Sequence, residues 1–464
     1  MTQIKKGDKK TMRAWAFYDW ANSVYPLVIS TAIFPVFYES QTSTKNELKE
    51  VVSDLVIFFG YEIKNSVLYS FVVAASFLAV IILSPLLSGV ADYSGSKKGF
   101  LQFFCYLGAG ATASLYFFDP EHLEWSMLSL FLASLGFWNS LVFYNAYLPE
   151  VAEKKDHDKL SAFGFSMGYA GSVILLVTCL VLIMTETATA QFCFLLTGVW
   201  WAGFAQITYR RLPNRRGRNK VTRKILADGF RELRKVGRFA FRTVRLKRYL
   251  IAFFIFSMGV QTVMLMAVLF AKKEIFNRPD SNEAGLIIAV LLIQFVAIGG
   301  AFVFSACSRA FGNIKTLGAA LVIWAICCTA AYQIIDTEME FYVLAAFVGF
   351  VMGGTQALSR STYSKFLPRT RDTASFFSFY DITEKAGIVL GMLIFGYVEA
   401  TSGDMRASVL ALISFFALGF IALLFVPKNE ADHVNMNPEN LPDEIIDDDG
   451  TNEILDDGSL LEGQ

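Results

Sequence analysis

Charged residues inside otherwise apolar stretches of the sequence are the first candidates for chemistry. Asp381, Glu384 and Lys385 share one such stretch, and Asp19 lies in another. Asp381 and Lys385 are four positions apart, which places them on one helix face with the acid before the base. A charge in the middle of a membrane helix costs about 3 kcal/mol and usually marks an ion or substrate pathway. We therefore predict that this group binds a charged solute group or relays protons; a structural ion pair is the alternative.

Other polar and aromatic side chains in the apolar stretches are candidates for lining the same pathway. Each has a second interpretation as a hydrogen-bonding contact between helices, worth only about 0.6 kcal/mol. Asp19 has a second interpretation too, as a contact with backbone near the cytoplasmic side. The predicted solute and proton pathway comprises Asp19, Trp20, Asn22, Asn139, Tyr144, Asn145, Gln261, Gln356, Tyr380, Asp381, Glu384 and Lys385.

The sequence does not predict an enzyme. Gly164-Phe-Ser-Met-Gly168 matches the G-x-S-x-G string of serine hydrolases, but that motif needs a strand-turn-helix elbow and later acid and histidine partners. The sole later histidine is His433, in an acidic tail. We predict that Gly164 and Gly168 pack helices instead, as do Gly387 and Gly391. The six cysteines lie in apolar runs without zinc-like spacing, so we expect no catalytic residues, no metal and no cofactor.

The elements that must position these residues are predicted to be membrane-spanning helices. Of the 464 residues, 54% are hydrophobic and 18% charged, against about 25% charged in soluble proteins. A span needs about 20 apolar residues. Twelve runs satisfy this length: 15–38, 66–90, 100–118, 124–147, 161–184, 190–209, 249–271, 284–305, 315–335, 340–360, 375–398 and 405–426. The apolar segment 51–60 is too short to span, and we place it in an extended first loop.

The basic residues predict an orientation with both termini cytoplasmic. With the N-terminus inside, 33 Lys and Arg face the cytoplasm and seven face outward. An internal repeat indicates two six-helix halves, because Gly95 and Lys98 recur as Gly312 and Lys315. We divide the chain into a cytoplasmic N-terminus (1–14), an N-terminal half (15–209), a basic cytoplasmic linker (210–248), a C-terminal half (249–426) and an acidic disordered tail (427–464).

The linker and the tail carry opposite charge. Sixteen Lys and Arg lie in 210–248, interspersed with apolar residues. From Glu430 to the end there are twelve Asp and Glu and no Lys or Arg. We expect the linker to lie against anionic headgroups, and an electrostatic pairing of the tail with the linker is an open alternative. Because the linker is tethered between membrane spans, we expect no nucleic acid among its partners.

The loop after the second predicted helix resembles a gating signature of the major facilitator superfamily, G-x-x-x-D-x-x-G-x-K/R-K/R. In that signature the aspartate and the basic residues latch neighbouring helix ends on the cytoplasmic side. The second-half loop keeps Gly312 and Lys315 but has Arg309 where the aspartate would fall, so a latch there must work differently. The residues that match the gating loop are Gly89, Asp92, Gly95, Lys97 and Lys98.

Four further stretches together indicate a family. They are Arg13-Ala-Trp-Ala-Phe-Tyr-Asp19-Trp-Ala-Asn22-Ser, Phe143-Tyr-Asn-Ala-Tyr-Leu-Pro-Glu150, Gln356-Ala-Leu-Ser-Arg360-Ser and Phe376-Phe-Ser-Phe-Tyr-Asp381-Ile-Thr-Glu-Lys385. They resemble the vacuole-effluxer-like, "unknown major facilitator" family, which includes the autophagy-related vacuolar amino-acid effluxer of fungi. The resemblance covers about residues 12–426 and implies the major facilitator fold, alternating access and, for the fungal branch, amino-acid export.

Together these features predict an all-α polytopic membrane protein that is a secondary active transporter of a small polar solute, coupled to protons. Amino acids are the solute class that the resemblance suggests. The expected partners are the small-molecule solute, the lipid bilayer and protons, and we expect a monomer. The expected location is the cytoplasmic membrane of a bacterium, or the vacuolar membrane of a eukaryote. The alternatives are a receptor or scaffold that does not transport, and a lipid-moving facilitator on the same fold.

Overall fold

The structure is a computed structural model that describes residues 6–45, 51–213, 225–276, 284–368, 370 and 372–428. The predicted acidic tail from residue 429 onward, His433 included, lies outside the described residues, as do residues 214–224 of the linker. The long apolar runs form helices because a backbone in lipid must satisfy its hydrogen bonds internally.

The N-terminal half contains six long helical stretches and several short segments. Its elements are α1 (Lys9–Asn22), the π-helical η1 (Tyr25–Ile33), α2 (Phe34–Thr42), α3 (Asn65–Ser94), α4 (Lys97–Ser114), the 3-10 turn η2 (Leu115–Phe117), α5 (Leu123–Ala146), α6 (Leu148–Val151), the 3-10 turn η3 (Lys154–Asp156), α7 (His157–Met184) and α8 (Ala190–Arg211).

The first membrane crossing is longer and less regular than the predicted span 15–38. It runs from Lys9 to Thr42 through α1, η1 and α2, which together are long and apolar enough to cross a membrane. Pro26 and Pro35 lie near the starts of η1 and α2. Each proline lacks a backbone donor, so the regular helical pattern is interrupted at these two points.

The predicted extended first loop forms two small β-hairpins in place of an irregular connection. Strand β1 (Thr44–Lys45) pairs with β2 (Val51–Ser53), and β3 (Leu55–Phe58) pairs with β4 (Tyr61–Lys64), both antiparallel. In the second hairpin Phe59 and Gly60 have φ of 49° and 82°. Two consecutive positive φ values are typical of the tight turn that suits a twisted hairpin.

The C-terminal half follows the linker helix α9 (Ile225–Arg242). Its elements are α10 (Val244–Phe270), the π-helical η4 (Ala271–Ile275), α11 (Ala284–Phe311), α12 (Asn313–Gln333), α13 (Glu338–Phe366), α14 (Thr373–Ser402) and α15 (Met405–Leu424). Eleven helical stretches of the described chain are long and apolar enough to cross a membrane. The remaining predicted span, 375–398, lies in α14, whose 30 residues exceed the required length but include the charged group predicted to carry the chemistry.

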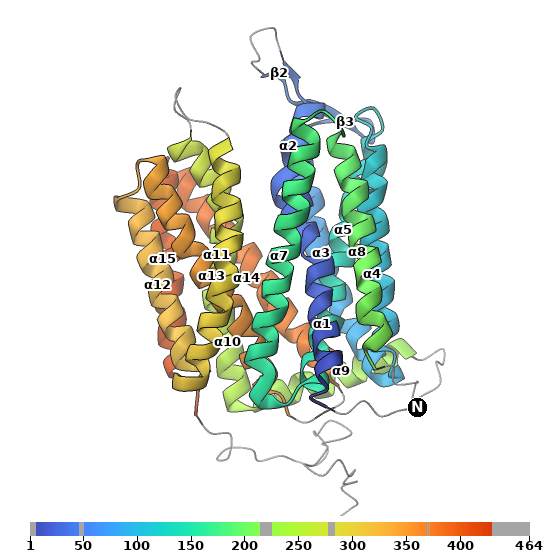
Figure 1. Cartoon of the computed structure of the whole chain (residues 1–464), viewed down its shortest axis with the longest axis vertical. Helices are drawn as coiled ribbons and strands as arrows, with labels where there is room; N and C mark the ends of the chain where they lie inside the picture. Colours follow the sequence, from blue (N-terminus) through green and yellow to red (C-terminus); the bar gives the residue numbers. More distant parts are fainter. Residues whose placement is uncertain are drawn as a thin grey trace, which may run out of the picture.

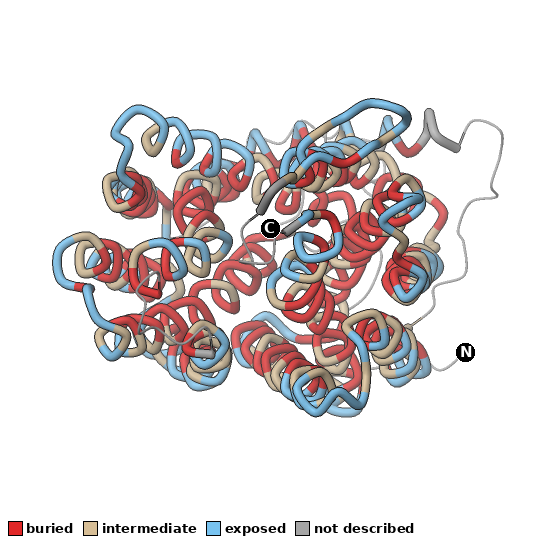
Figure 2. Tube along the Cα trace, turned by 90° about the horizontal axis from the view of Figure 1, so that it is seen from above, coloured by how far each residue is buried: buried red, intermediate tan, exposed pale blue. Residues whose placement is uncertain are grey.

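The two halves stand side by side as upright bundles, with the strands at one end and α9 at the other (Figure 1). Helix α7 packs against α11 and α13 across the interface, and α14 packs against α3 and α5. Viewed along the bundle, the buried residues face the interior of the two halves and the contact between them (Figure 2). The residues that face lipid are mostly exposed and apolar, as expected for a membrane protein.

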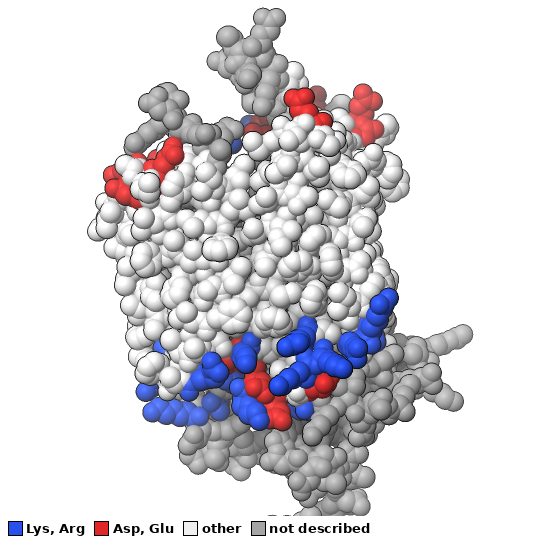
Figure 3. Space-filling view, in the orientation of Figure 1, with Lys and Arg blue, Asp and Glu red and all other residues white. Residues whose placement is uncertain are grey.

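Charge is segregated between the two ends of the molecule. Figure 3 shows Lys and Arg gathered at the end opposite the strands, whereas the other end displays mostly acidic side chains. We name the first of these the basic end; it includes the α3–α4 loop and the starts of α7 and α14. By the positive-inside rule this is the side predicted to face the cytoplasm.

The predicted packing roles of the two glycine pairs are confirmed. A Cβ atom on Gly168 would overlap the Ser23 hydroxyl beside α1, and one on Gly391 would overlap the Thr262 hydroxyl of α10. Gly164 and Gly387 are similarly close to α1 and α10. These glycines allow α7 and α14 to approach their neighbours closely, which is how small residues contribute to helix association in membranes.

Candidate functional site

The charged residues of α14 form a compact ion cluster. Lys385 is completely buried, and its Nζ lies 3.0 Å from Asp381 Oδ1 and 3.0 Å from Glu384 Oε2. From α10, Gln261 Nε2 donates a hydrogen bond of 2.7 Å to Glu384 Oε1. Four of the predicted pathway residues are therefore in direct contact.

An aromatic ring from the other half completes this group. Lys385 Nζ lies 3.6 Å from the centroid of the Trp138 ring on α5. A cation over a tryptophan face is stabilised by about 2 kcal/mol when both are desolvated. Trp138 was not among the predicted pathway residues, because one tryptophan in an aromatic-rich helix carries no signal of its own. We name Trp138, Gln261, Asp381, Glu384 and Lys385 the α14 cluster.

One carboxylate oxygen of the α14 cluster has no partner. Asp381 is 5% exposed, and its Oδ2 is buried without a hydrogen bond among the described residues. With both acids ionised, the cluster carries two negative charges and one positive charge. Burial of an uncompensated charge is costly, so this site favours the arrival of one more positive charge, as a proton or as a cationic group of a solute.

A second buried ion pair joins the two halves closer to the basic end. Arg360 of α13 is 3% exposed, and its Nη1 and Nη2 each lie 3.1 Å from Asp19 Oδ2 of α1. The same oxygen accepts a hydrogen bond of 2.8 Å from the Tyr144 hydroxyl. Arg360 also donates to Ser161 of α7 and, at 3.3 Å, to Asn145 Oδ1. The structure thus brings Asp19, Tyr144 and Asn145 together around an arginine.

Arg360 was not among the predicted pathway residues, because the predicted helix ends there. The predicted span closes at residue 360, so the arginine was counted with the cytoplasmic basic residues; α13 in fact continues to Phe366. The side chain lies among the helices, with its guanidinium 4.1 Å from the Phe165 ring centroid. The signal that could have identified it is the apolar and small-residue sequence on both sides, which is typical of a helix interior.

The remaining predicted pathway residues are dispersed. Gln356 of α13 accepts a hydrogen bond from the Tyr169 hydroxyl of α7, so it also bridges the halves. Tyr380 stacks on Phe253 with ring centroids 4.3 Å apart. Trp20 packs within its own half, against α8. Asn22 and Asn139 are buried and each retains one side-chain atom without a partner among the described residues.

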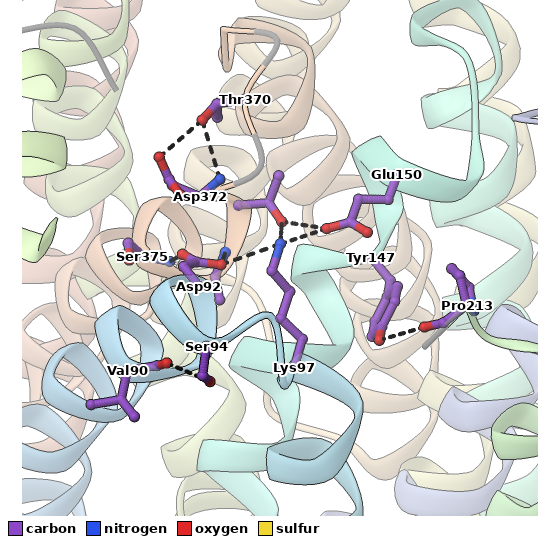
Figure 4. Close-up of polar contacts among 12 residues, drawn as sticks. Val90, Asp92, Ser94, Lys97, Tyr147, Glu150, Pro213, Thr370, Asp372 and Ser375 are labelled. Carbon is purple, nitrogen blue, oxygen red and sulfur yellow. Dashed lines mark hydrogen bonds and ion pairs between the residues drawn. The ribbon is translucent and has the colours of Figure 1, made fainter. Parts of the chain in front are cut away.

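The predicted gating loop contacts α14 at the basic end. Asp92 Oδ2 accepts a hydrogen bond of 2.7 Å from the Ser375 backbone N–H, and Asp92 Oδ1 accepts one of 3.3 Å from the Ala374 N–H (Figure 4). These donors belong to the first turn of α14, where helical N–H groups lack partners and the helix dipole is positive. The aspartate of the first half therefore caps a helix of the second half.

Lys97 contacts residues of both halves in the same region. Its Nζ lies 2.6 Å from Glu150 Oε1 and 3.2 Å from Asp92 Oδ1, and it donates a hydrogen bond of 2.7 Å to Thr373 Oγ1 (Figure 4). Lys97 is only 7% exposed. We name the set Asp92, Lys97, Glu150 and Thr373 the first latch.

The other residues of the gating signature have different positions. Gly95 ends α3 with a φ of 69°, a conformation that favours glycine. Lys98 donates to the Leu212 carbonyl within the same half, at 3.1 Å. Gly89 faces the linker helix, because a Cβ there would overlap the carbonyl oxygen of Gly229.

A second latch has the opposite arrangement of charge. Asp158 in the first turn of α7 accepts hydrogen bonds from Ser308 Oγ (2.7 Å) and Asn313 Nδ2 (2.8 Å) at the α11–α12 loop. Lys365 of α13 lies 2.5 Å from the same carboxylate. Here the acid is at the start of α7, and the end of α11 and the start of α12 supply neutral donors, while Arg309 is exposed. This is how the second-half loop works without the aspartate of the signature.

An apolar cavity lies within the C-terminal half. Its lining comes from α10, α11, α12, α13, α14 and α15 and includes Met266, Trp324, Cys327 and Phe341. None of its lining residues is charged, and none belongs to the α14 cluster. The cavity therefore does not bring the predicted pathway residues together.

Comparison with known proteins identifies the family. A sequence profile described as "Vacuole effluxer Atg22 like" matches residues 7–433. The chain belongs to this vacuole-effluxer-like family. An uncharacterized MFS-type transporter of Bacillus subtilis, YxiO, is 31% identical and aligns over 93% of this chain and 98% of its own length. Autophagy-related protein 22-1 of Neosartorya fischeri is 23% identical over 95% of this chain and 93% of its own.

Solved structures show the same fold. The E. coli fucose:proton symporter FucP has a TM-score of 0.64 at 14% identity, covering 90% of this chain and 98% of FucP. The human organic anion transporter MFSD10 has a TM-score of 0.65 at 11% identity, covering 91% of this chain and all of that chain. The chain therefore has the major facilitator fold and is a multi-pass membrane protein of a transporter family.

Proposed function

We propose that this family member is a secondary active transporter that moves a small polar solute by alternating access, with the α14 cluster as the site of solute and proton binding. The observation that carries the proposal is Lys385, completely buried between two carboxylates and beneath the Trp138 ring of the opposite half. Solute sites of such folds lie near the midplane between the repeats. A merely structural bundle gains little from three charges at this depth.

The proposed coupling follows from the charge of the α14 cluster. A proton on Asp381 or Glu384 removes one of the two negative charges and weakens the electrostatic attraction between the carboxylates and Lys385. A cationic group of the solute has the same electrostatic effect, so the two compete for one compensating position at the unpartnered Asp381 Oδ2. Because Trp138 and Lys385 belong to different halves, occupancy of this position changes a contact between them, and hence the balance between the two access states.

The basic end is closed in this conformation. The two latches and the Asp19–Arg360 pair each connect the halves on this side of the α14 cluster. Alternating access then requires all three to separate when the site opens toward the basic end. We propose that Arg360 acts as the inner gate and the two latches as the outer gate.

We propose amino acids as the solute. We further propose that the protein is a monomer in a bacterial cytoplasmic membrane, with both termini on the cytoplasmic side. The ammonium group of an amino acid fits the unpartnered acceptor on Asp381. The relatives support a transport role in broad terms: FucP is a fucose:proton symporter, and XylE, a proton:xylose symporter, shares the fold with a TM-score of 0.65. Fucose and xylose are the solutes of those proteins, and we do not propose them for this one.

Reconstitution tests the proposal. Purified protein in proteoliposomes is screened with radiolabelled amino acids, peptides and sugars, with and without a pH gradient. We expect uptake of an amino acid that responds to the gradient, and at least tenfold slower uptake in Glu384→Gln and Lys385→Ala. Lys315→Ala, an exposed lysine at the basic end, is the control and should transport normally. Normal, pH-dependent uptake in both cluster variants would overturn the proposed site.

The same vesicles distinguish the alternative functions. Solute that binds without ever exchanging across the membrane would support a receptor or scaffold. Movement of a fluorescent phospholipid between leaflets, without solute uptake, would support a lipid-moving facilitator.

A further inference from the structure

The linker helix α9 bridges the two halves at the basic end. Its Gly229 lies against Gly89 and Val90 of α3, so closely that a Cβ on either glycine would overlap backbone of the other helix. Farther along α9, Phe239 packs edge-to-face on Phe376 of α14 with ring centroids 5.9 Å apart. One helix thus contacts a helix of each half.

Both contacts of α9 are adjacent to the first latch. Gly89 precedes Asp92 by one turn of α3, and Phe376 follows Ser375, whose N–H binds Asp92. Phe379, one turn further, packs against Phe241 with ring centroids 6.2 Å apart. If the halves separate at the basic end, α9 must release either α3 or α14. The position of α9 and the state of the first latch are therefore linked.

The outward face of α9 is exposed and has a mixed aromatic and basic character, and Phe241 lies at its edge, where it also touches Phe379. Phe230 and Phe241 are 55% and 58% exposed, although both are large and apolar. Arg234, Arg238 and Arg242 are exposed on the same side. At about 100° per residue these five positions fall within an arc of roughly 120°. An exposed stripe of this composition is typical of a helix that lies in a membrane interface, with rings among the acyl chains and guanidinium groups at phosphates.

The geometry points to anionic lipid headgroups as the occupant of this face, and we propose that their binding holds α9 across α3 and α14 and so favours the closed basic end. Three observations favour lipid over another partner. The face is strongly basic, it carries two exposed aromatic rings, and α9 packs against the first turns of α14 and the last turns of α3, which is the depth of the headgroup region. A membrane rich in anionic lipid would then slow opening toward the basic end, independently of which solute is carried.

The test uses the full chain in nanodiscs of pure phosphatidylcholine and of phosphatidylcholine with 30% phosphatidylglycerol. Hydrogen–deuterium exchange reports on α9, and the distance between spin labels at Lys154→Cys and Lys315→Cys, in a Cys307→Ala background, reports on opening at the basic end. We expect anionic lipid to slow exchange in α9 at least fivefold and to shift the distances toward the closed population. The triple variant Arg234→Gln/Arg238→Gln/Arg242→Gln should show neither effect.

A matched triple variant, Lys9→Gln/Lys10→Gln/Arg13→Gln, removes three exposed basic residues at the start of α1 and should respond like the wild type. The proposal is overturned if the wild type is insensitive to lipid composition, or if the α9 variant keeps its response. It is also overturned if the slow exchange of α9 persists in pure phosphatidylcholine and is lost on deletion of residues 429–464, because the acidic tail would then be the occupant. Neither measurement depends on transport. A negative result would therefore not bear on the proposed function, which the uptake assay tests separately.

Discussion

At the scale of single residues, the structure separates two kinds of buried charge. The Asp19–Arg360 pair is balanced, and its hydrogen bonds are satisfied by Tyr144 and Ser161. The α14 cluster is unbalanced and leaves Asp381 Oδ2 without a hydrogen bond to any residue that the structure describes. A balanced pair is suited to holding two helices together, whereas an unbalanced cluster is suited to binding and releasing a cation.

Removing one partner of the balanced pair should destabilise the protein strongly. Arg360→Leu leaves Asp19 buried without a counterion, and we expect a loss of about 3–5 kcal/mol. Thermal unfolding in detergent measures the effect as a lower Tm. The double variant Asp19→Leu/Arg360→Leu, which removes both charges, should recover a large part of the loss. A double variant as unstable as the single one would show that the pair is not the cause.

Trp138 should affect the affinity for solute rather than the fold. Trp138→Leu removes the ring above Lys385, a contact worth about 2 kcal/mol, and we expect the half-saturation concentration for solute to rise roughly ten- to thirtyfold. Trp138→Phe should retain part of the affinity. Trp125→Leu is the control, since Trp125 is 73% exposed at the far end of α5. Equal uptake by Trp138→Leu and the wild type would remove Trp138 from the site.

At the scale of elements, hydropathy and helical periodicity were sufficient to place the helices. The charged residues of α14 that we propose as the site were identifiable because they interrupt an apolar run. What could not be read was which helices face each other. Trp138 contacts Lys385 and Arg360 contacts Asp19, in both cases more than 200 positions away in the sequence. A single chain without an alignment gives no information on such contacts.

The two hairpins after α2 and the extension of α13 past residue 360 were missed for local reasons. Short strands outside the membrane do not need a long apolar run, so the span criterion says nothing about them. Helix ends in membranes extend into the headgroup region, where polar residues such as Thr362 and Lys365 are tolerated. The predicted span therefore ends one to two turns before the end of α13.

Packing of α7 against α1 should be sensitive to one methyl group. A Cβ on Gly164 would lie 2.5 Å from Asp19 Oδ2 and 3.0 Å from Arg360 Nη2. We expect Gly164→Ala to cost about 1–3 kcal/mol through overpacking, measured as a lower Tm. Gly110→Ala has open space around its Cβ and should be neutral or slightly stabilising. Equal Tm shifts in the two variants would contradict the close packing seen here.

At the scale of the whole molecule, the basic end is closed at two separate points. The first latch joins α3 to α14, and the second joins α7 to α11, α12 and α13. Because the two share no residues, their contributions to closure should be nearly additive. The α14 cluster is thus separated from the basic end by contacts at both edges of the interface.

Weakening the latches should open the basic end in steps. Asp92→Asn and Asp158→Asn each remove a charge that the partner groups require, and the double variant should open most. A cysteine at Ser378, buried one turn above the first latch, reports on opening through its reaction with a membrane-impermeant maleimide. We expect each single variant to react several times faster than the latch-intact protein. Cys327, buried within the C-terminal half, should stay unreactive throughout; labelling of Cys327 would indicate unfolding instead.

The opposite polarity of the two latches has a consequence for assembly. In the first latch the end of α3 provides the carboxylate and the start of α14 provides backbone donors. In the second latch the start of α7 provides the carboxylate, and the end of α11 and the start of α12 provide hydroxyl and amide donors. If two N-terminal halves met in the same way, Asp158 of one copy would face Asp92 of the other, and two carboxylates would repel each other. The contacts at the basic end therefore favour the pairing of an N-terminal half with a C-terminal half over the pairing of two N-terminal halves.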